Sequence, residues 1–310
     1  MFPYSITRKW INPEQSKVAK LTKPYLLFDA GGTLVFPDQP CLIQLARAYG
    51  IKLTHEQLFN GYCDLIYTWD HRVRKRGDDF PYNPWPEGYA CALLESIGIS
   101  GPVVKAINQA VETRHRKKSL WTFTFSWVPE ALDRLAAQGY RMSVISNSED
   151  PTCEIFEAVG LAHYFEQIFH SAKLGVAKPD PGIFEGALCK LNLQPTDALY
   201  IGDIYEVDVR GANAAGIGGI HLDPLGLCAD WAGVHLPDIR HLPNWLARYA
   251  DDPTAFDLFP FICPESLLQC KNRDNALIDW SHSRHSQEHY TALAQYDMAH
   301  TAQSRLLVRW

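Results

Sequence analysis

The chain has 310 residues and eight cysteines but no CxxC pair, so it lacks both the paired spacing of a zinc site and a disulfide framework. No apolar run reaches the length of a membrane span, and residues 1–23 lack the continuous apolar segment of a secretory signal. Positive charge is not in excess, since the formal net charge is −6. These absences predict a cytoplasmic protein with no membrane partner and no nucleic-acid partner.

What remains is an ordinary globular composition, 46% hydrophobic and 21% charged, in a chain long enough to bury a large core. Residues 1–23 are predicted to be a flexible leader. The pattern weakens from about residue 243, and residues 248–310 are predicted to form an extension of unknown role. In that extension His282, His285 and His289 could share one helical face, although an exposed polar stretch is the preferred interpretation.

The middle of the chain predicts two kinds of structure. After a first strand ending at Asp29, no strand pattern appears before residue 118, and Thr54 with Gln57 has the spacing of a capping box. From residue 127 strands alternate with helices, which predicts a parallel sheet. Residues 24–37 and 119–247 would form this α/β core, and residues 38–118 an α-helical cap. The predicted helices are 40–49, 54–76, 85–97, 103–117, 129–138, 151–159, 181–191 and 207–215; the later strands are 141–146, 167–170, 198–202 and, as the last, 218–222.

The most informative segment is Phe28-Asp29-Ala30-Gly31-Gly32-Thr33-Leu34, which follows an apolar run. An apolar run that ends in Asp and two glycines predicts a buried strand that delivers a carboxylate to a tight turn at its carboxyl end. Ligands bind at that edge of open α/β sheets. Asp29 is therefore a candidate nucleophile, although an Asp that merely caps the turn is the alternative.

Three later segments supply what such a carboxylate needs. In Ile145-Ser146-Asn147-Ser148, a hydroxyl and backbone N–H groups could hold phosphate oxygens, although the same residues suit a helix cap. In Ala177-Lys178-Pro179-Asp180-Pro181, the lysine could keep Asp29 ionised and neutralise a phosphoryl group. In Ile201-Gly202-Asp203-Ile204-Tyr205-Glu206-Val207-Asp208, two further carboxylates near Asp29 would require a cation, and Mg²⁺ prefers such oxygen ligands. Asp208 could equally be a helix cap.

In their order and spacing these four segments resemble the motifs of the haloacid dehalogenase (HAD) superfamily, in particular the hydrolases with a helical cap between the first and second motifs. The resemblance extends over residues 25–246 and implies a Rossmann-like parallel sheet with an inserted α-helical cap. It implies catalysis by Asp29, Lys178 and Ser146 through an aspartyl-phosphate, with phosphate held by Ser146, Asn147 and Lys178. It also implies Mg²⁺ bound by Asp29, the backbone carbonyl of Gly31 and Asp203, with Thr33 and Asp208 supporting these ligands.

One position departs from the family's pattern. The phosphatases of the family carry a second Asp two residues after the nucleophile, where this chain has Gly31. That Asp protonates the leaving alkoxide and then activates water, and general acid–base catalysis contributes about 10²–10⁴-fold. We expect a Mg²⁺-dependent hydrolase of a small phosphorylated molecule, with acyl and aryl phosphates least affected by the loss. The alternative is a catalytically weak or inactive relative that serves as a binding module.

Two other branches of the family are less favoured. The dehalogenases have a similar first motif but need no Mg²⁺ and lack the Gly-Asp of the fourth motif, which this chain keeps at Gly202-Asp203. The phosphonatases use a cap lysine as a Schiff base, and Lys52, Lys75, Lys117 and Lys118 lie in the predicted cap outside any recognised motif. Basic clusters at 71–76 and 114–118 could steer an anionic substrate, although solvated helix ends are commoner.

Overall fold

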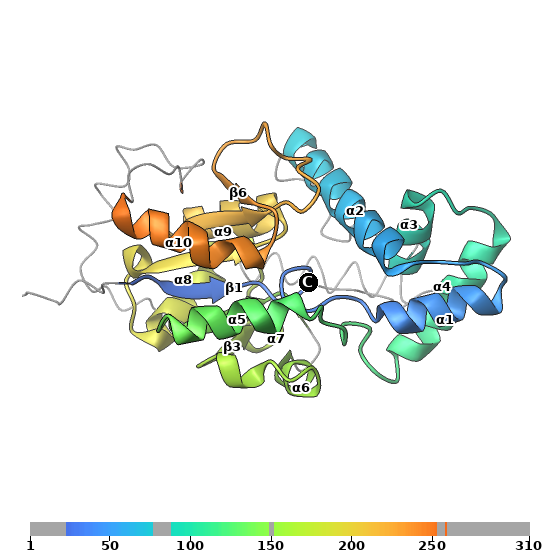
Figure 1. Cartoon of the computed structure of the whole chain (residues 1–310), viewed down its shortest axis with the longest axis horizontal. Helices are drawn as coiled ribbons and strands as arrows, with labels where there is room; N and C mark the ends of the chain where they lie inside the picture. The colour runs from blue at the N-terminus through green and yellow to red at the C-terminus, as the bar shows by residue number, and fades with distance from the viewer. Residues whose placement is uncertain (1–22, 77–87, 149–151, 253–257, 259–310) are drawn as a thin grey trace, which may run out of the picture.

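The computed structural model describes residues 23–76, 88–148, 152–252 and 258 (Figure 1). Its centre is a six-stranded sheet in the order β3-β2-β1-β4-β5-β6, and every neighbouring pair is parallel. The predicted α/β fold with a parallel sheet is confirmed. The strands are β1 (Tyr25–Phe28), β2 (Met142–Ser146), β3 (Ile168–His170), β4 (Ala198–Gly202), β5 (Gly218–Leu222) and β6 (Val234–Leu236).

The two central strands position the candidate site. β1 and β4 are buried along their whole length, as expected where helices cover both faces of a parallel sheet. Leu27 of β1 lies beside Ser143 of β2 on one side and Tyr200 of β4 on the other. The strand order reverses between β1 and β4, and the carboxyl ends of strands at such a switch point form a crevice that binds ligands.

Helices cover both faces of the sheet because successive strand residues point to opposite sides. Leu26 and Phe28 pack with α5 (Trp127–Ala137), α6 (Thr152–Ala158) and α10 (Leu242–Asp251). Leu27 and Tyr200 pack on the other face with α8 (Pro181–Leu191) and α9 (Arg210–Ala214). The remaining short elements of this part are η2 (Ala162–Tyr164), α7 (Ser171–Leu174), η3 (Pro195–Asp197), η4 (Tyr205–Val209) and η5 (Ile239–His241).

Between β1 and α5 the chain forms a group of helices beside the sheet, on the right in Figure 1. The predicted capping box at the start of its longest helix is confirmed: Gln57 N donates to Thr54 Oγ1 (3.1 Å), and Thr54 N donates to Gln57 Oε1 (3.0 Å). The helices of this insert are α1 (Gln39–Ala48), α2 (His55–Arg76), α3 (Tyr89–Ser96) and α4 (Pro102–His115).

The two chain segments that join the insert to the sheet pair with each other. Phe36 N donates to Phe123 O (2.7 Å), and Phe123 N donates to Phe36 O (3.1 Å). Aromatic rings surround this joint: the centroids of Phe36 and Phe125 are 4.8 Å apart, and Phe125 stacks on Trp127 at 5.2 Å. Such pairs add to the stability that burial alone provides.

The structure corrects the prediction that residues 218–222 form the last strand, since strand β6 follows it; helix α10 is the last helix among the described residues. Strand β6 has only three residues and forms by pairing with β5, so no periodic pattern marks it in the sequence. The helix predicted over 207–215 begins instead as the π-helical turn η4 and continues as α9. Nearly all of the predicted leader, most of the extension and its three histidines lie outside the described residues. Within the described residues, no helix is both long and apolar enough to cross a bilayer.

Candidate active site

Three carboxylates meet at the carboxyl ends of the two central strands. Asp29 follows β1 directly, Asp203 follows β4, and Asp208 lies in η4. All three residues are buried, and each offers an oxygen atom such that the three atoms lie within 4.8 Å of one another. Carboxylates at this distance repel each other in their ionised forms, so the cluster requires compensating positive charge.

Lys178 supplies part of that charge from the loop before α8. Its Nζ donates to Asp29 Oδ1 (2.5 Å), Asp208 Oδ1 (2.7 Å) and Tyr200 Oη (2.9 Å). These three bonds use all three donors of the ammonium group. Lys178 is only 2% exposed and is therefore fixed in position, where it orients Asp29.

The segment after β2 holds the loop that carries this lysine. Lys178 N donates to Asn147 Oδ1 (2.7 Å), and Asn147 Nδ2 donates to Lys178 O (2.8 Å). Both groups of the Asn147 amide thus contact the lysine backbone. Ser146 ends β2 and is also buried, so the residues predicted to bind phosphate lie at the same sheet edge as Asp29.

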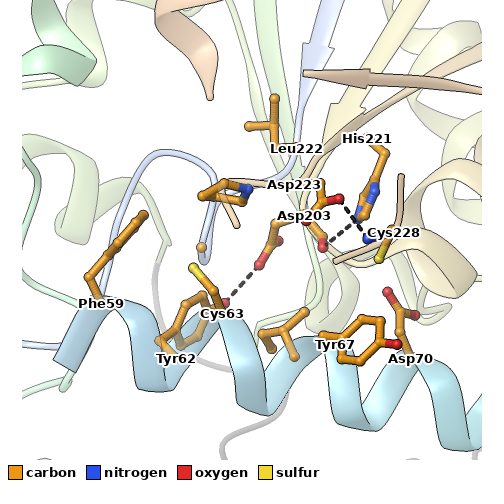
Figure 2. Close-up of a pocket in the computed structure, with 13 residues that line it drawn as sticks. Phe59, Tyr62, Cys63, Tyr67, Asp70, Asp203, His221, Leu222, Asp223 and Cys228 are labelled. Atoms are coloured by element: carbon orange, nitrogen blue, oxygen red, sulfur yellow. Dashed lines mark hydrogen bonds between the residues drawn. The ribbon is translucent and has the colours of Figure 1, made fainter. Parts of the chain in front are cut away.

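The turn after β4 is held from two sides. Ile204 N donates to Asp208 Oδ2 (2.9 Å), which closes the turn on itself. His221 Nε2 lies 3.0 Å from the backbone oxygen of Asp203. From the opposite side, Tyr62 Oη of helix α2 donates to Asp203 Oδ2 (2.8 Å), as Figure 2 shows. One oxygen of the Asp203 carboxylate is therefore held by the helical insert.

Burial dominates the electrostatics of the cluster. Burial raises the pKa of Asp29 to about 7; Lys178 opposes this rise and Asp208 adds to it. Burial also raises the pKa of Asp203 well above its usual range, and the charges of Asp29 and Asp208 add to the rise. For Lys178, burial opposes the charged form, but the two neighbouring carboxylates outweigh burial and raise the pKa.

Two oxygens of the cluster are buried without a hydrogen-bond partner among the described residues: Asp29 Oδ2 and Asp203 Oδ1. A buried acceptor left without a donor costs free energy. A hard cation between the two carboxylates would satisfy both oxygens, and carboxylate and carbonyl oxygens are the ligands that Mg²⁺ takes. The donor set therefore fits Mg²⁺. Gly31, whose backbone carbonyl is the third predicted ligand, lies in the same turn as Asp29 and forms a backbone β-bridge with Val35.

Of the two glycines in the turn after Asp29, the second, Gly32, cannot be replaced without strain. Gly32 has a φ of +79°, and a Cβ there would lie 2.0 Å from Asp203 Oδ2 and 2.2 Å from Tyr62 Oη. Gly31 is not among the described glycines with positive φ. Thr33 is fully buried, and its hydroxyl has no hydrogen-bond partner among the described residues.

A cavity lies between α2 and the carboxyl ends of β4 and β5 (Figure 2). Asp203 and Gly32 form the part of its wall next to the carboxylate cluster. Carboxylates and apolar or aromatic side chains form most of the rest. The other lining residues are Phe59, Tyr62, Cys63, Ile66, Tyr67, Asp70, His221, Leu222, Asp223, Pro224 and Cys228.

Among the side chains that the structure describes, no lysine or arginine of the insert forms an ion pair with this cluster. Each of the four candidate Schiff-base lysines, Lys52, Lys75, Lys117 and Lys118, is exposed. Two arginines of the basic clusters have structural contacts instead: Arg74 lies over the Trp231 ring, and Arg114 pairs with Asp38.

The sequence prediction missed three residues that contact this site. Tyr200 lies within β4, where the sequence pattern indicates only a strand residue, although its hydroxyl accepts from Lys178. Tyr62 and Asp70 stand eight residues apart on a predicted helix and so share one face, which was the only available signal. Nothing in the sequence indicates that this face meets Asp203.

Comparison with known proteins gives consistent matches. The family model described as haloacid dehalogenase-like hydrolase matches residues 91–221. A glyceraldehyde 3-phosphate phosphatase of Methanopyrus kandleri is 33% identical over 203 residues, which cover 62% of this chain and 80% of that protein. The human haloacid dehalogenase-like hydrolase domain-containing protein 3 is 32% identical over 209 residues, covering 64% of this chain and 82% of that protein. A phosphoserine phosphatase of Thermus thermophilus is 30% identical over 141 residues, covering 45% of this chain and 55% of that protein.

Proposed function

Because the chain belongs to the haloacid dehalogenase-like hydrolases, we propose that it is a Mg²⁺-dependent phosphatase that acts through an aspartyl-phosphate on Asp29. The substrate would be a small phosphorylated molecule, the class to which glyceraldehyde 3-phosphate and phosphoserine belong, named in two of its relatives. The insert over residues 38–118 would serve as the cap of a core formed by residues 24–37 and 119–247.

The observation that carries this proposal is a pair of buried oxygens, Asp29 Oδ2 and Asp203 Oδ1, that have no hydrogen-bond partner among the residues the structure describes. An Asp that merely capped the turn would not leave an oxygen buried and unsatisfied. Lys178 holds the other oxygen of Asp29 at 2.5 Å and leaves Oδ2 to face a substrate or a cation. Asp29, Asp203 and the carbonyl of Gly31 would hold Mg²⁺, which supplies charge that neutralises the phosphoryl oxygens.

The chemistry of Asp29 would proceed in two displacements. The Asp29 carboxylate attacks phosphorus, the bond from phosphorus to the ester oxygen breaks, and the leaving group departs with the bonding electrons. Water then attacks the phosphorus of the aspartyl-phosphate, releases inorganic phosphate and restores the carboxylate. Lys178 keeps Asp29 oriented, and Ser146 with its neighbouring backbone would bind the phosphoryl oxygens.

Gly31 defines which leaving groups suit this site. No carboxyl group stands at that position to protonate a departing alkoxide, so alkyl phosphates depend on a proton that this residue cannot supply. The carboxylate of an acyl phosphate and the aryloxide of an aryl phosphate can leave without a proton, so acyl and aryl phosphates should be the better substrates. Because no carboxyl group activates the attacking water, hydrolysis of the aspartyl-phosphate would be slow and this intermediate would persist.

The test is a screen of phosphorylated metabolites, with acyl and aryl phosphates included, in the presence and absence of Mg²⁺. We expect phosphate release that requires Mg²⁺ and disappears in Asp29→Asn, because an amide is a poor nucleophile. Acid quenching should trap a phosphoryl group on Asp29 in the wild type only. Activity that survives in purified Asp29→Asn would show that another site or another enzyme is responsible.

A second candidate function is a catalytically inactive binding module, and Gly31 is the observation that favours it. Such a module would bind a phosphorylated ligand and Mg²⁺ but form no adduct on Asp29. Ligand binding without any trapped adduct, for acyl, aryl and alkyl phosphates alike, would replace the phosphatase proposal with this one.

A further inference from the structure

Helix α2 contacts the core along one face. Tyr62, Ile66, Asp70 and Arg74 follow one another at intervals of four residues, which places them on the same side of the helix. Tyr62 donates to Asp203, and Arg74 lies 4.7 Å from the centroid of the Trp231 ring. Figure 2 shows Tyr62 and Asp70 on α2, beside the cavity that borders Asp203.

Asp70 makes the most specific of these contacts. Its Oδ2 accepts from Tyr205 N (2.6 Å) and its Oδ1 accepts from Glu206 N (2.9 Å), so both carboxylate oxygens hold the backbone of η4. The residue is 1% exposed, although the basic residues that follow it directly, at positions 71, 72, 74 and 75, are exposed. A carboxylate buried to this extent is costly unless its hydrogen bonds are complete. The two backbone bonds are therefore the reason that this carboxylate can stay buried.

The bonds of Asp70 continue into the catalytic cluster. Asp70 binds the N–H groups of Tyr205 and Glu206, which lie two and three residues after Asp203, and Asp208 follows Glu206 by two residues. Asp208 accepts from Lys178 Nζ (2.7 Å), and the same Nζ donates to Asp29 (2.5 Å). Hydrogen bonds, together with the short backbone segment from Glu206 to Asp208, thus link a residue of the insert to the proposed nucleophile.

We propose that Asp70 is a positioning residue: it fixes η4 when α2 is seated, and so makes the geometry of Asp29, Lys178 and Asp208 depend on the seating of the insert. The proposal deepens the proposed function, because it states how the insert would control the same site. Without Asp70, the N–H groups of Tyr205 and Glu206 lose the two carboxylate oxygens that accept from them, and the start of the segment that carries Asp208 is held less firmly. A displacement of about 1 Å at reacting groups can lower the rate about 100-fold.

The first test uses the wild-type protein and needs no substrate. Hydrogen exchange should show the amides of Tyr205 and Glu206 to be strongly protected, because buried oxygens of another element accept from both. In Asp70→Asn, an amide nitrogen replaces one acceptor, and exchange over η4 should rise at least about tenfold. Asp64→Asn removes an exposed carboxylate from the same helix and should leave exchange over η4 unchanged.

The second test is kinetic. With the best substrate of the phosphatase screen, Asp70→Asn and Asp70→Ala should lower kcat about 10- to 100-fold and leave KM within about twofold, whereas Asp64→Asn should match the wild type. If the contact served only to stabilise the fold, its loss would lower the amount of folded protein but would not change kcat per folded molecule. The concentration of folded protein is therefore measured by circular dichroism and used to calculate kcat.

Several results would overturn the proposal. Fast exchange of the Tyr205 and Glu206 amides in the wild type would do so, as would unchanged exchange over η4 in Asp70→Asn. A raised KM with unchanged kcat would mean that Asp70 contacts the substrate instead. If the wild type hydrolyses no phosphate ester, the proposed function fails, while the exchange measurements still decide the role of Asp70. If Asp70→Ala does not fold, Asp70→Asn and the wild-type exchange rates remain decisive.

Discussion

At the residue scale, the proposed chemistry depends on Lys178 and on two oxygens without hydrogen-bond partners in the described part of the chain, one of Asp29 itself and one of Asp203. The sequence predicts the participants because each follows an apolar run or stands in a proline-stiffened loop. The sequence does not predict which of these residues contact one another. All three donors of Lys178 go to Asp29, Asp208 and Tyr200, so the lysine would act on the proposed nucleophile more directly than on a substrate.

Gly31→Asp tests the departure from the family pattern. A carboxyl group at this position could protonate a leaving alkoxide and then activate water, so turnover of an alkyl phosphate should rise about tenfold or more. The backbone permits the change, since Gly31 is not among the described glycines with positive φ. The measurement is steady-state kinetics, with thermal unfolding to check the fold. A folded variant with no gain on alkyl phosphates would mean that proton transfer is not what limits this site.

Tyr62→Phe tests whether the insert supports the metal ligands. The variant loses the hydroxyl that donates to Asp203 Oδ2, so the carboxylate is less well oriented toward a cation. Loss of such a supporting hydrogen bond typically weakens metal affinity about 10- to 100-fold, which titration calorimetry with Mg²⁺ can measure.

Tyr67→Phe is the matched control, because the Tyr67 ring stacks on Trp231 and keeps that contact without its hydroxyl. Equal Mg²⁺ affinities in the wild type and Tyr62→Phe would contradict a supporting role, and Asp203→Ala should abolish binding altogether.

At the scale of elements, strands β4 and β5 have the bounds that their apolar runs predict, since a strand buried on both faces needs such a run. The elements that the sequence does not predict are short or depend on partners. Strand β6 forms only because β5 offers an open edge, and η4 is π-helical where the sequence pattern indicates an ordinary helix. Such local departures follow from tertiary contacts, which periodicity does not encode.

The turn between β1 and the insert provides a sharp test at this scale. In Gly32→Ala the new Cβ would overlap Asp203 Oδ2 and Tyr62 Oη, and the residue would also adopt a φ of +79°. The clash falls on two side chains of the cluster, so we expect a loss of about 1–3 kcal/mol in unfolding free energy and weaker Mg²⁺ binding.

Gly50→Ala is the control for backbone strain, because Gly50 has a φ of +78° and no atom within 4 Å of an added Cβ. The excess loss in Gly32→Ala over Gly50→Ala, measured by denaturant unfolding, reports the clash alone. Equal losses in the two variants would mean that Asp203 and Tyr62 move aside freely, which would contradict a tightly held cluster.

At the scale of the whole molecule, the site is shared between two parts of the chain. The sheet brings Asp29 and Asp203 together, and the order of the motifs suffices to predict this. Helix α2 adds Tyr62 and Asp70 to the same site. That contribution depends on where the insert sits, and neither residue stands in a motif, so it could be found only from the structure.

The buried carboxylates couple Mg²⁺ binding to pH. Burial raises the pKa of Asp29 from 3.8 to about 7, so the folded protein without metal retains a proton that the unfolded chain releases at lower pH. Between about pH 4 and pH 7 the folded state therefore binds more protons, and its stability falls as the pH rises through this window. Mg²⁺ binds the ionised carboxylates and must displace these protons.

We therefore expect Mg²⁺ to bind more tightly at pH 8 than at pH 5, and to raise the melting temperature more at the higher pH. Binding at pH 6 should release protons, because Asp29 and Asp203 both have raised pKa values in the metal-free protein. Calorimetry in two buffers with different ionisation heats counts the released protons directly. Asp203→Ala should show neither heat nor release. An affinity for Mg²⁺ that does not change between pH 5 and pH 8 would contradict the protonated cluster, because a cation competes with every proton that the carboxylates hold.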